Sequence, residues 1–426
     1  MSGAEGWECE LCIVGAGAAG LWAAAVAAAR GTDVLVLEKT PRTGTKVLAS
    51  GGTHCNLTTT LGPDAAARLF GAQGERFLRP AFRRLPPAAV RERFHAFGVP
   101  TIEAPLEKVF PASGRARDVR DALEREARAA GARIALNAPV VGVAPAFRAG
   151  AGPAPGARGW EVRVADGRSA RARRVFLCSG GKSYPRTGTT GEGYAWLAEL
   201  GLEVREPVPA LVPLASPAAW VRDLTGIAWA GGEARLLDAS GRVLGRRRRP
   251  LLFTHFGVSG PAAMDLSAHV ARAPGANVLQ LDLFPDVSRE ELRAHLVDAA
   301  GARGAPRVGE VLPERVPERL LAAACAAAGV QERRPRVVDL SKATRHALIE
   351  ALKGLAIPVA GTLGFDKAEV TAGGLALRQV DPLSMEVTGL SGLHVFGELL
   401  DLDGPIGGLN FQAAFACAEV AACALG

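Results

Sequence analysis

The chain has 426 residues, of which 48% are apolar and 22% are charged. This length predicts two or three domains, and this composition excludes a disordered or fibrous protein. The 50 Lys and Arg residues exceed the 43 Asp and Glu residues, but the positive charge is scattered and only 5% of residues are aromatic. Nucleic acid is therefore not a favoured partner.

The chain opens with a strand, a glycine-rich turn and a helix. Residues 11–14 predict a short apolar strand, residues 15–20 read Gly-Ala-Gly-Ala-Ala-Gly, and an Ala-rich helix follows. The uncharged stretch 11–29 is long enough to span a bilayer, but its glycines and the acidic residues before it favour a strand–turn–helix over a membrane segment or secretory signal. Residues 34–37 form the next strand, which ends at Glu38. We expect a cytoplasmic protein with no membrane partner.

Helices and then strands follow this first unit. Residues 64–97 look helical with breaks at their prolines, and a second helix is expected at 117–130. Apolar runs predict strands at 140–143, 160–164 and 174–178. The Gly/Pro/Ala-rich stretch 149–159 is expected to be a hairpin loop.

The character of the chain changes after Gly201. Short β-like runs come first, and helices broken by prolines follow them. The arginine run 246–249 is expected on a solvated turn or strand edge. Strands and a final helix then return. We therefore expect an inserted domain at 201–354 that divides an α/β domain into residues 1–200 and 355–426.

The glycine-rich turn has the pattern of a dinucleotide-binding fingerprint. Gly15 suits the tight turn, Gly17 lets a pyrophosphate approach the backbone, and Gly20 lets helix and strand pack closely. The helix N-terminus offers N–H groups and positive partial charge to phosphates. Glu38 can accept hydrogen bonds from ribose hydroxyls. The pattern indicates FAD or NAD without separating them, and a tight turn without a ligand is the alternative.

Later segments favour FAD over NAD. Residues 43–46 lead into 50–56, a loop that can wrap a pyrophosphate and reach the flavin. Residues 177–181 end a buried strand at two glycines. Residues 394–398 end another strand at a Gly-Glu pair, where the acid can bind ribitol hydroxyls. Residues 407–410 open the last helix, whose N-terminus can stabilise the negative charge of a reduced flavin.

Several of these segments carry the motifs of a known family. The runs 48–56, 253–261 and 397–405 resemble the BaiN/YhiN-like flavoproteins, also labelled aminoacetone-oxidase-family FAD-binding enzymes, and the match runs nearly end to end. The resemblance implies a glutathione-reductase-type, Rossmann-like FAD-binding α/β domain with an inserted small β-barrel and helical part. The chain departs from the family at 44–46, where the pattern has Gly-Arg-Lys, and at 51–56, where it has Gly-Gly-Gly-Arg-Cys-Asn. Because of these departures, we infer no substrate for this chain from the family resemblance.

The expected cofactor is FAD, held non-covalently, with NADH or NADPH as a candidate electron donor and no metal. The candidate cofactor-binding residues lie in the segments above, with one more on a strand. They are Gly15, Gly17, Ala18, Ala19, Gly20, Glu38, Lys39, Thr45, Lys46, Ser50, Gly51, Gly52, Asn56, Val141, Ser179, Gly180, Gly181, Gly397, Glu398, Gly407, Gly408, Leu409 and Asn410.

Three side chains are candidates for proton transfer. Flavin enzymes do their chemistry at N5 of the cofactor, so the protein must orient the substrate and move protons. His255 lies in a turn-rich run that suits a site and equally a structural histidine. Tyr184 lies three residues after Gly181, and His54 lies in the loop 50–56. His255 and Tyr184 are the predicted catalytic residues.

The cysteines are not expected to carry chemistry. Cys9-x-x-Cys12 looks like a redox pair, but an extended strand holds residues three apart about 10 Å from one another, too far for a disulfide. Cys55 has no second cysteine near it in the sequence, unlike the pair of the flavin disulfide reductases.

The leading hypothesis is an FAD-dependent oxidoreductase that acts on a small or medium organic substrate by hydride transfer through flavin N5, next to a carbonyl. One alternative is a flavoprotein that acts on tRNA, which basic residues clustered beside the flavin would favour. The other is a non-catalytic flavin-binding sensor, which failure to turn over with any donor would favour.

Overall fold

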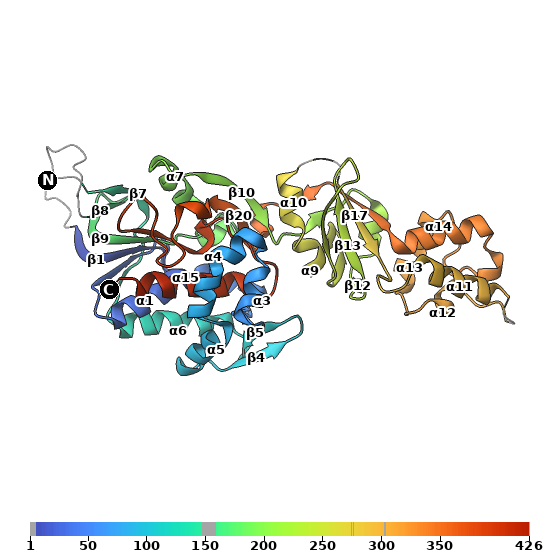
Figure 1. Ribbon diagram of the computed structural model, residues 1–426, viewed down its shortest axis with the longest axis horizontal. Coiled ribbons are helices and arrows are strands. Elements are labelled where there is room, and N and C mark those ends of the chain that lie inside the picture. Colours follow the sequence, from blue (N-terminus) through green and yellow to red (C-terminus); the bar gives the residue numbers. More distant parts are fainter. Residues whose placement is uncertain (1–5, 147–158, 274, 276, 302–303, 426) are drawn as a thin grey trace. The chain divides into compact units, whose positions relative to one another are not determined.

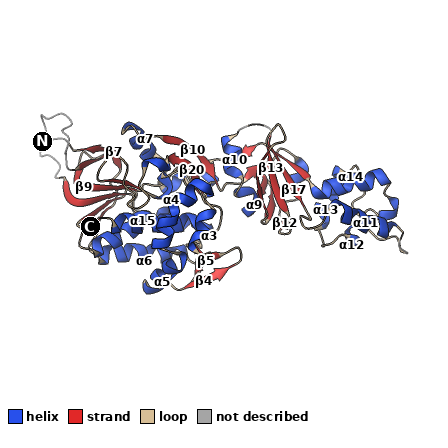
Figure 2. Ribbon diagram, viewed as in Figure 1, coloured by secondary structure: helices blue, strands red, loops and turns tan. Residues whose placement is uncertain are grey.

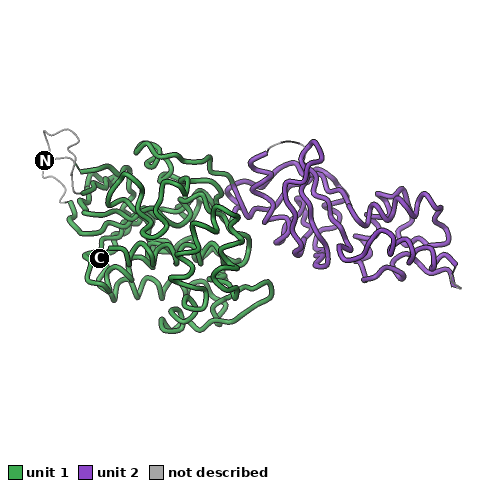
Figure 3. The backbone as a smooth tube through the Cα atoms, viewed as in Figure 1, with its two compact units in different colours: residues 1–208, 369–426 green, residues 209–368 purple. Residues whose placement is uncertain are grey.

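The structure is a computed structural model that describes residues 6–146, 159–273, 275, 277–301 and 304–425. It divides into two compact units (Figure 3). Unit 1 consists of Met1–Val208 and Glu369–Gly426, and unit 2 is Pro209–Ala368. All but the last residue of the expected hairpin loop, 149–159, lies outside the described residues.

The junctions between the units differ from the predicted ones. β10 (Val204–Ala210) pairs with β20 (Val370–Leu375), so the chain stays in unit 1 up to residue 208 rather than 200. β18 (Leu355–Val359) pairs with β17 (Asn277–Asp282) inside unit 2. The chain therefore returns to unit 1 at residue 369 rather than at residue 355. Pairing between strands far apart in the sequence decides both junctions, and a local pattern does not reveal it.

Unit 1 is built on a seven-stranded sheet (Figure 1). Its order is β6-β2-β1-β9-β8-β7, and β21 also pairs with β9. The strands are β1 (Trp7–Val14), β2 (Val34–Leu37), β6 (Arg133–Ala135), β7 (Val140–Pro145), β8 (Trp160–Val164), β9 (Ser169–Leu177) and β21 (Leu393–Val395). All pairs that involve β1, β2, β6 or β21 are parallel, whereas β7, β8 and β9 form an antiparallel meander.

Helices from both ends of the sequence pack together on unit 1. They are α1 (Ala18–Ala29), α6 (Ala116–Ala129) and α15 (Leu409–Cys423). Trp22 of α1 is buried, its ring centroid lies 4.8 Å from that of Phe415, and its Nε1 donates to Glu419 at 2.8 Å. The predicted strand–turn–helix is confirmed, and no helix in the described part of the chain is long and apolar enough to cross a membrane.

The other elements of unit 1 border this core. The helices are α2 (Thr45–Ala49), α3 (Pro63–Arg68), α4 (Gly71–Arg84), α5 (Pro87–Ala96) and α7 (Glu192–Glu199), with short 3-10 turns η1 (Ser50–Thr53), η2 (Pro185–Thr187), η5 (Leu377–Gln379) and η6 (Gly397–Leu399). A small sheet contains β3 (Thr58–Thr59), β4 (Thr101–Ala104) and β5 (Lys108–Pro111). The break expected at Pro80 is wrong, because α4 continues through it with Phe77, Ala81 and Phe82 buried around it.

Unit 2 contains two antiparallel sheets and a helical part (Figure 2). One sheet has β12 (Ala228–Trp229), β15 (Leu251–Thr254), β16 (Gly257–Ser259), β11 (Leu214–Ala215) and β19 (Gly361–Thr362). The other has β14 (Val243–Arg247), β13 (Glu233–Leu237), β17 and β18. The helices are α8 (Ala219–Asp223), α9 (Gly260–Met264), α10 (Ser267–Arg272), α11 (Arg289–Ala300), α12 (Val308–Val311), α13 (Glu318–Ala327) and α14 (Lys342–Lys353), with η3 (Val337–Asp339) and η4 (Phe365–Lys367).

The strands of unit 2 were expected to form one small barrel. The described strands pair as two sheets, and side chains from both sheets and from the helices share one buried core. The arginine run 246–249 lies at the edge strand β14, as predicted. Two of its side chains also form ion pairs with a buried carboxylate. Arg247 and Arg249 lie 3.7 and 2.9 Å from the carboxylate of Asp265, which is fully buried and needs their positive charge.

Cys9 and Cys12 lie on β1, and both are free thiols. A hydrogen bond between the two side chains, together with burial, raises the pKa of Cys12 well above its usual range. The ladder between β1 and β9 keeps one register through both cysteines, with Cys9 opposite Ala172 and Cys12 opposite Val175.

Candidate functional site

The glycine-rich turn after β1 has the geometry that a dinucleotide needs. Gly15 has φ +102°, and a Cβ there would lie 2.8 Å from the carbonyl oxygen of Cys178 at the end of β9. A Cβ at Gly20 would lie 1.9 Å from the carbonyl oxygen of Gly15, so only glycine lets α1 pack this closely. A Cβ at Gly17 would meet no atom within 4 Å. The turn is therefore crowded on the protein side and open at Gly17.

The N-terminus of α1 begins at this opening. The first N–H groups of a helix have no partner within the helix, and no side chain among the described residues caps those of α1. An anion is stabilised at such a position by the N–H groups and by the helix dipole. The turn thus fits a pyrophosphate beside Gly17.

Glu38 reaches back to the same turn. Its Oε2 accepts a hydrogen bond from the backbone N–H of Ala16 at 2.9 Å, and its Oε1 accepts from the backbone N–H and the hydroxyl of Thr40, both at 2.8 Å. A carboxylate has about four acceptor positions. The position of Glu38 beside the opening suits contact with a ribose, and the same carboxylate braces the turn.

Glu38→Ala is expected to weaken FAD binding roughly tenfold or more, because a charge-assisted hydrogen bond contributes about 1.5–3 kcal/mol. The FAD-free protein should lose less stability than that, since the freed N–H groups are only part-buried and can bind water. Dialysis of the loaded protein and titration of FAD measure the effect. Glu10→Ala is the matched control, because Glu10 is an exposed acid on β1. Equal FAD retention in both variants would make Glu38 a structural acid only.

Segments far apart in the sequence converge on this turn. Gly44 donates its N–H to the carbonyl oxygen of Ala16 at 2.8 Å, which places the segment 43–46 beside the turn. A Cβ at Gly397 would lie 3.5 Å from the Cβ of Ala19 in the first turn of α1. The three segments that the sequence predicts around the fingerprint, including the end of β9, therefore meet in unit 1.

Ser179 provides a separate indication of a ligand. Its hydroxyl oxygen is buried and has no hydrogen-bond partner among the residues that the structure describes. The residue follows the end of β9 and lies against the glycine-rich turn, because a Cβ on Gly15 would come within 2.9 Å of its Cα. Buried hydroxyls normally have partners, so this one fits a polar group of the cofactor.

Lys46 and Glu398 form an ion pair at the centre of the converging segments. Ser183 joins them: its hydroxyl oxygen accepts from Lys46 Nζ at 2.5 Å, and the hydroxyl donates to Glu398 Oε1 at 2.5 Å. Thr371 donates its backbone N–H to the same carboxylate at 2.8 Å, and its hydroxyl oxygen accepts from the N–H of Lys182 at 2.8 Å. Sequence reasoning missed the roles of Ser183 and Thr371, although each lies two residues from a Gly-Gly pair, Gly180-Gly181 and Gly373-Gly374.

The loop 50–56 borders the N-terminus of α15. Gly51 and Gly52 have φ +54° and +64°, a left-handed conformation that glycine adopts without strain. A Cβ at Gly408 would lie 2.9 Å from Asn56 Oδ1, so the loop and the start of α15 are in contact. No side chain from the described residues caps α15, whose first N–H groups offer a second site for negative charge.

Other predicted cofactor residues have protein partners. The side-chain amide of Asn410 donates to the carbonyl oxygen of Gly404 and accepts from its N–H, both at 2.9 Å, so Asn410 braces the loop. Lys39 pairs with Glu192 at 2.7 Å. Thr45 and Ser50 donate their hydroxyls to the carbonyl oxygens of Arg42 and Val47.

The remaining predicted residues lie at turns and strand ends. Val141 is 54% exposed at an irregularity of β7. Gly180 and Gly407 have φ +81° and +146°, and Leu409 is buried. A Cβ at Gly181 would lie 2.8 Å from Glu398 Oε1, which places that glycine against the central ion pair.

The two predicted catalytic residues lie in different units. Tyr184 is in unit 1, where it follows Ser183, and burial and the neighbouring Glu369 carboxylate raise its pKa. Its phenol therefore stays neutral at physiological pH. His255 is exposed on the turn between β15 and β16 of unit 2, with its ring against Phe256 at 4.9 Å. Its role stays a prediction.

Cys55 is fully buried, and burial raises the pKa of its thiol to about 12. The thiol is therefore protonated at neutral pH and is a poor nucleophile. We expect iodoacetamide to leave Cys55 unlabelled in the native protein and to label it after unfolding, as mass spectrometry can show. The half-buried Cys9 and Cys423 are internal controls. Rapid native labelling of Cys55 would contradict this account of the loop.

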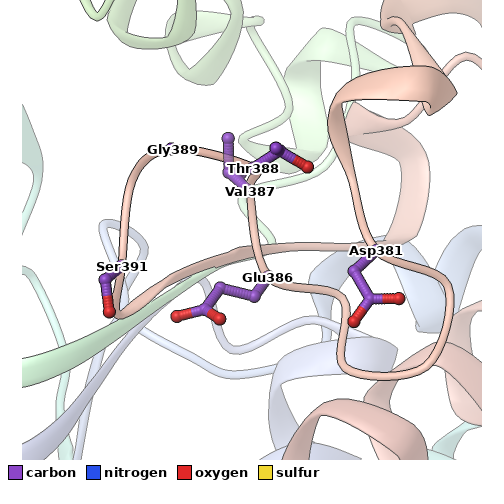
Figure 4. Close-up of a pocket in the computed structure, with 6 residues that line it drawn as sticks. All are labelled: Asp381, Glu386, Val387, Thr388, Gly389 and Ser391. Carbon is purple, nitrogen blue, oxygen red and sulfur yellow. The ribbon is translucent and has the colours of Figure 1, made fainter.

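A pocket of about 340 Å³ lies away from these segments, on the loop 381–391 (Figure 4). Its two carboxylates already accept hydrogen bonds from the loop itself. Glu386 accepts from the N–H of Gly392 at 2.7 Å, and Asp381 accepts from the N–H of Leu383 at 3.0 Å. The pocket includes no predicted cofactor residue, so it is not the candidate site.

The chain matches a family model over nearly its whole length. Residues 9–424 match the model described as HI0933-like protein Rossmann domain. The chain belongs to this family. Membership in the HI0933-like family confirms the resemblance to the BaiN/YhiN-like flavoproteins and the predicted Rossmann-like FAD-binding α/β fold. It also confirms the predicted class, an FAD-dependent oxidoreductase.

Curated proteins are similar to this member of the HI0933-like family from end to end. A 3-dehydro-bile acid delta(4,6)-reductase of Clostridium scindens is 30% identical, and the alignment covers 96% of this chain and 97% of that protein. A ribosomal RNA dihydrouridine synthase of Escherichia coli is 28% identical over 96% of both chains. A protein of the same name from Haemophilus influenzae is also 28% identical.

Solved structures support the fold. A 3-ketosteroid-delta4-(5alpha)-dehydrogenase of Rhodococcus jostii RHA1 aligns with a TM-score of 0.52 over 99% of this chain and 98% of that one, at 16% identity. A 3-ketosteroid delta1-dehydrogenase of Sterolibacterium denitrificans aligns with a TM-score of 0.50 over 98% and 99%, at 14% identity. At these identities the similarity concerns the fold alone.

Proposed function

We propose that this protein is an FAD-dependent reductase that saturates a carbon–carbon double bond conjugated to a carbonyl group. The shared chemistry of the two named relatives carries the proposal. A delta(4,6)-reductase of a 3-dehydro bile acid saturates double bonds conjugated to the 3-oxo group, and a dihydrouridine synthase saturates the uracil double bond conjugated to a ring carbonyl. Both reactions add a hydride to the β-carbon and a proton to the α-carbon. The proposed substrate is a small or medium enone.

The converging segments of unit 1 would hold the cofactor. The opening at Gly17 and the N-terminus of α1 would take the pyrophosphate, and Glu38 the adenosine ribose. Glu398, held by Lys46 and Ser183, would take ribitol hydroxyls. The flavin ring would lie against the loop 50–56 and the N-terminus of α15. Bound FAD supplies hydride transfer at N5.

The chain's own residues must then stabilise charge and move a proton. As the β-carbon gains a hydride, negative charge develops on the substrate's carbonyl oxygen, and a hydrogen-bond donor aimed at that oxygen stabilises it. Tyr184 is a candidate for this role from unit 1, because its phenol O–H is protonated at neutral pH. His255 stays a candidate from unit 2.

Cofactor identity and electron transfer test this function. The purified protein should be yellow and release FAD, not FMN, on denaturation, because the adenosine end has its own site. Under anaerobic conditions NADH and NADPH are compared as donors, and 3-oxo-4-ene steroids, simple enones, amines and oxygen as acceptors. Formation of a saturated ketone supports the proposal. Release of FMN, or turnover of amines or oxygen alone, contradicts it.

A second candidate substrate is uridine in ribosomal RNA, which replaces the tRNA alternative. Two relatives bear the name ribosomal RNA dihydrouridine synthase, and basic residues outnumber acidic ones in unit 2. RNA transcripts of the large and small ribosomal subunits are incubated with the reduced protein, and dihydrouridine is measured by mass spectrometry. Formation of dihydrouridine without reduction of free enones favours RNA as the substrate. Reduction of free enones without formation of dihydrouridine favours the small substrate.

A further inference from the structure

His54 lies in the loop 50–56 and is held by one ring nitrogen. Its Nδ1 lies 2.7 Å from the carbonyl oxygen of Gly114. Because a carbonyl can only accept, Nδ1 carries a proton and donates it to this bond. The other nitrogen, Nε2, has no hydrogen-bond partner among the described residues, and the side chain is exposed.

The backbone around His54 is fixed in an unusual conformation. Gly51, Gly52, Thr53 and Cys55 have φ between +54° and +76°, and the last two are not glycine. Such residues persist only where the surrounding structure holds them, and they cluster at functional sites. Here the buried Cys55 anchors the loop, and Asn56 Oδ1 accepts from the N–H of Val109 at 3.1 Å. His54 is therefore presented from a rigid support.

The other described histidines of unit 1 are committed elsewhere. His95 lies in the last turn of α5, and its Nε2 accepts the N–H of Thr101 at 3.0 Å. His394 is buried on β21, and its Nδ1 lies 2.9 Å from the carbonyl oxygen of Ser384. Of the three, His54 is the exposed histidine on the loop 50–56, and this loop contacts the start of α15 through Asn56.

We propose that His54 is the catalytic acid that protonates the α-carbon of the substrate through Nε2. The proposal rests on the proposed function, in which the flavin ring lies against the loop 50–56. Histidine at this position makes the loop itself a proton donor.

The step balances as the addition of one hydride and one proton. The carbon–carbon π bond breaks and two C–H bonds form. The hydride carries both electrons from the reduced flavin to the β-carbon, which leaves an enolate. The enolate takes the Nε2 proton of the His54 imidazolium at its α-carbon, and the imidazole is left neutral until solvent returns a proton. A two-electron donor of the NADH or NADPH class would return the flavin to its reduced state.

Two variants separate proton transfer from loop support. His54→Asn keeps a donor to Gly114, since the Asn Nδ2 takes the place of Nδ1, but it has no Nε2. His54→Gln keeps a polar group near Nε2 that cannot transfer a proton. In the FAD-loaded proteins, reduced with dithionite, we expect enone reduction to slow about 100-fold or more in both. FAD content and dithionite reduction should be unchanged, and His95→Asn should match the wild type.

A second readout does not depend on turnover. Flavin reduction adds negative charge, so the ring NMR signals of His54 in the FAD-loaded wild type should shift between the oxidised and reduced states, whereas those of His95 should not. The ring signals of His54 are assigned as those that are absent from the spectrum of the His54→Asn variant. Wild-type turnover in that variant, unshifted ring signals, or loss of FAD from both variants would overturn the proposal. If the wild-type protein reduces no enone but the His54 ring signals still shift on flavin reduction, the proposed substrate is wrong. The placement of His54 beside the flavin is then still supported.

Discussion

Gly17→Val is expected to abolish FAD binding while leaving the fold intact. A Cβ at this position meets no atom within 4 Å, and the backbone angles of φ −78° and ψ −168° are extended, which valine adopts readily. The added methyl groups would fill the space beside the N-terminus of α1 in which the pyrophosphate is proposed to lie. We expect FAD to bind about 100-fold or more weakly, which corresponds to about 2.8 kcal/mol.

Gly20→Val is the contrasting variant on the same turn. Its Cβ would lie 1.9 Å from the carbonyl oxygen of Gly15, so the first strand and α1 must separate, at about 3 kcal/mol or more of folding free energy. Gly17→Val should lose only about 1 kcal/mol, from a poorer helix N-cap. Thermal unfolding of the FAD-free proteins and FAD titration distinguish the two effects. Retention of FAD by Gly17→Val through dialysis would contradict the placement of the pyrophosphate.

Lys353→Met is expected to destabilise unit 2 by about 3–5 kcal/mol. The side chain is only 7% exposed, and its Nζ lies 2.9 Å from the carboxylate of Asp282, which is 2% exposed. The same ammonium donates to the carbonyl oxygens of Phe284 at 2.6 Å and Val287 at 2.8 Å. Methionine has a similar volume but leaves a buried carboxylate and two carbonyl groups without this donor.

Hydrogen exchange of the α14 amides and the free energy of unfolding measure the loss. Lys342→Met, at the exposed start of the same helix, is the matched control and should change stability by less than about 0.5 kcal/mol. FAD content should be unchanged in both variants, because unit 1 holds the candidate site. A Lys353→Met protein as stable as the control would mean that Arg235, 3.3 Å from Asp282, is sufficient to neutralise it.

The elements of unit 1 could be predicted where their signals are local. Residues 11–14 and 34–37 are apolar because these parts of β1 and β2 are buried throughout, and Gly31 ends α1 with φ +87°. The junctions at 208 and 369 could not be predicted, because they depend on which distant strands pair. The arrangement of the unit 2 strands in two sheets could not be predicted either, because the sequence of one strand does not specify which strands pair with it.

The candidate site could also be predicted only in part from the sequence. The fingerprint glycines could be assigned individual roles because each role has a steric cause, and the clashes that a Cβ would meet agree with those roles. The network of Ser183 and Thr371 around Glu398 could not be predicted, because Ser183 contacts residues 188 and 215 positions away in the sequence. The sequence also left open that Asn410 binds its own loop rather than facing outward.

The most direct test of the central claim is anaerobic mixing of the dithionite-reduced, FAD-loaded protein with an enone such as a 3-oxo-4-ene steroid. Flavin absorbance and product are followed together. The account predicts that the oxidised flavin spectrum returns and that one saturated ketone forms for each flavin. A flavin that stays reduced with every enone and with ribosomal RNA, yet reoxidises normally with oxygen, would contradict it.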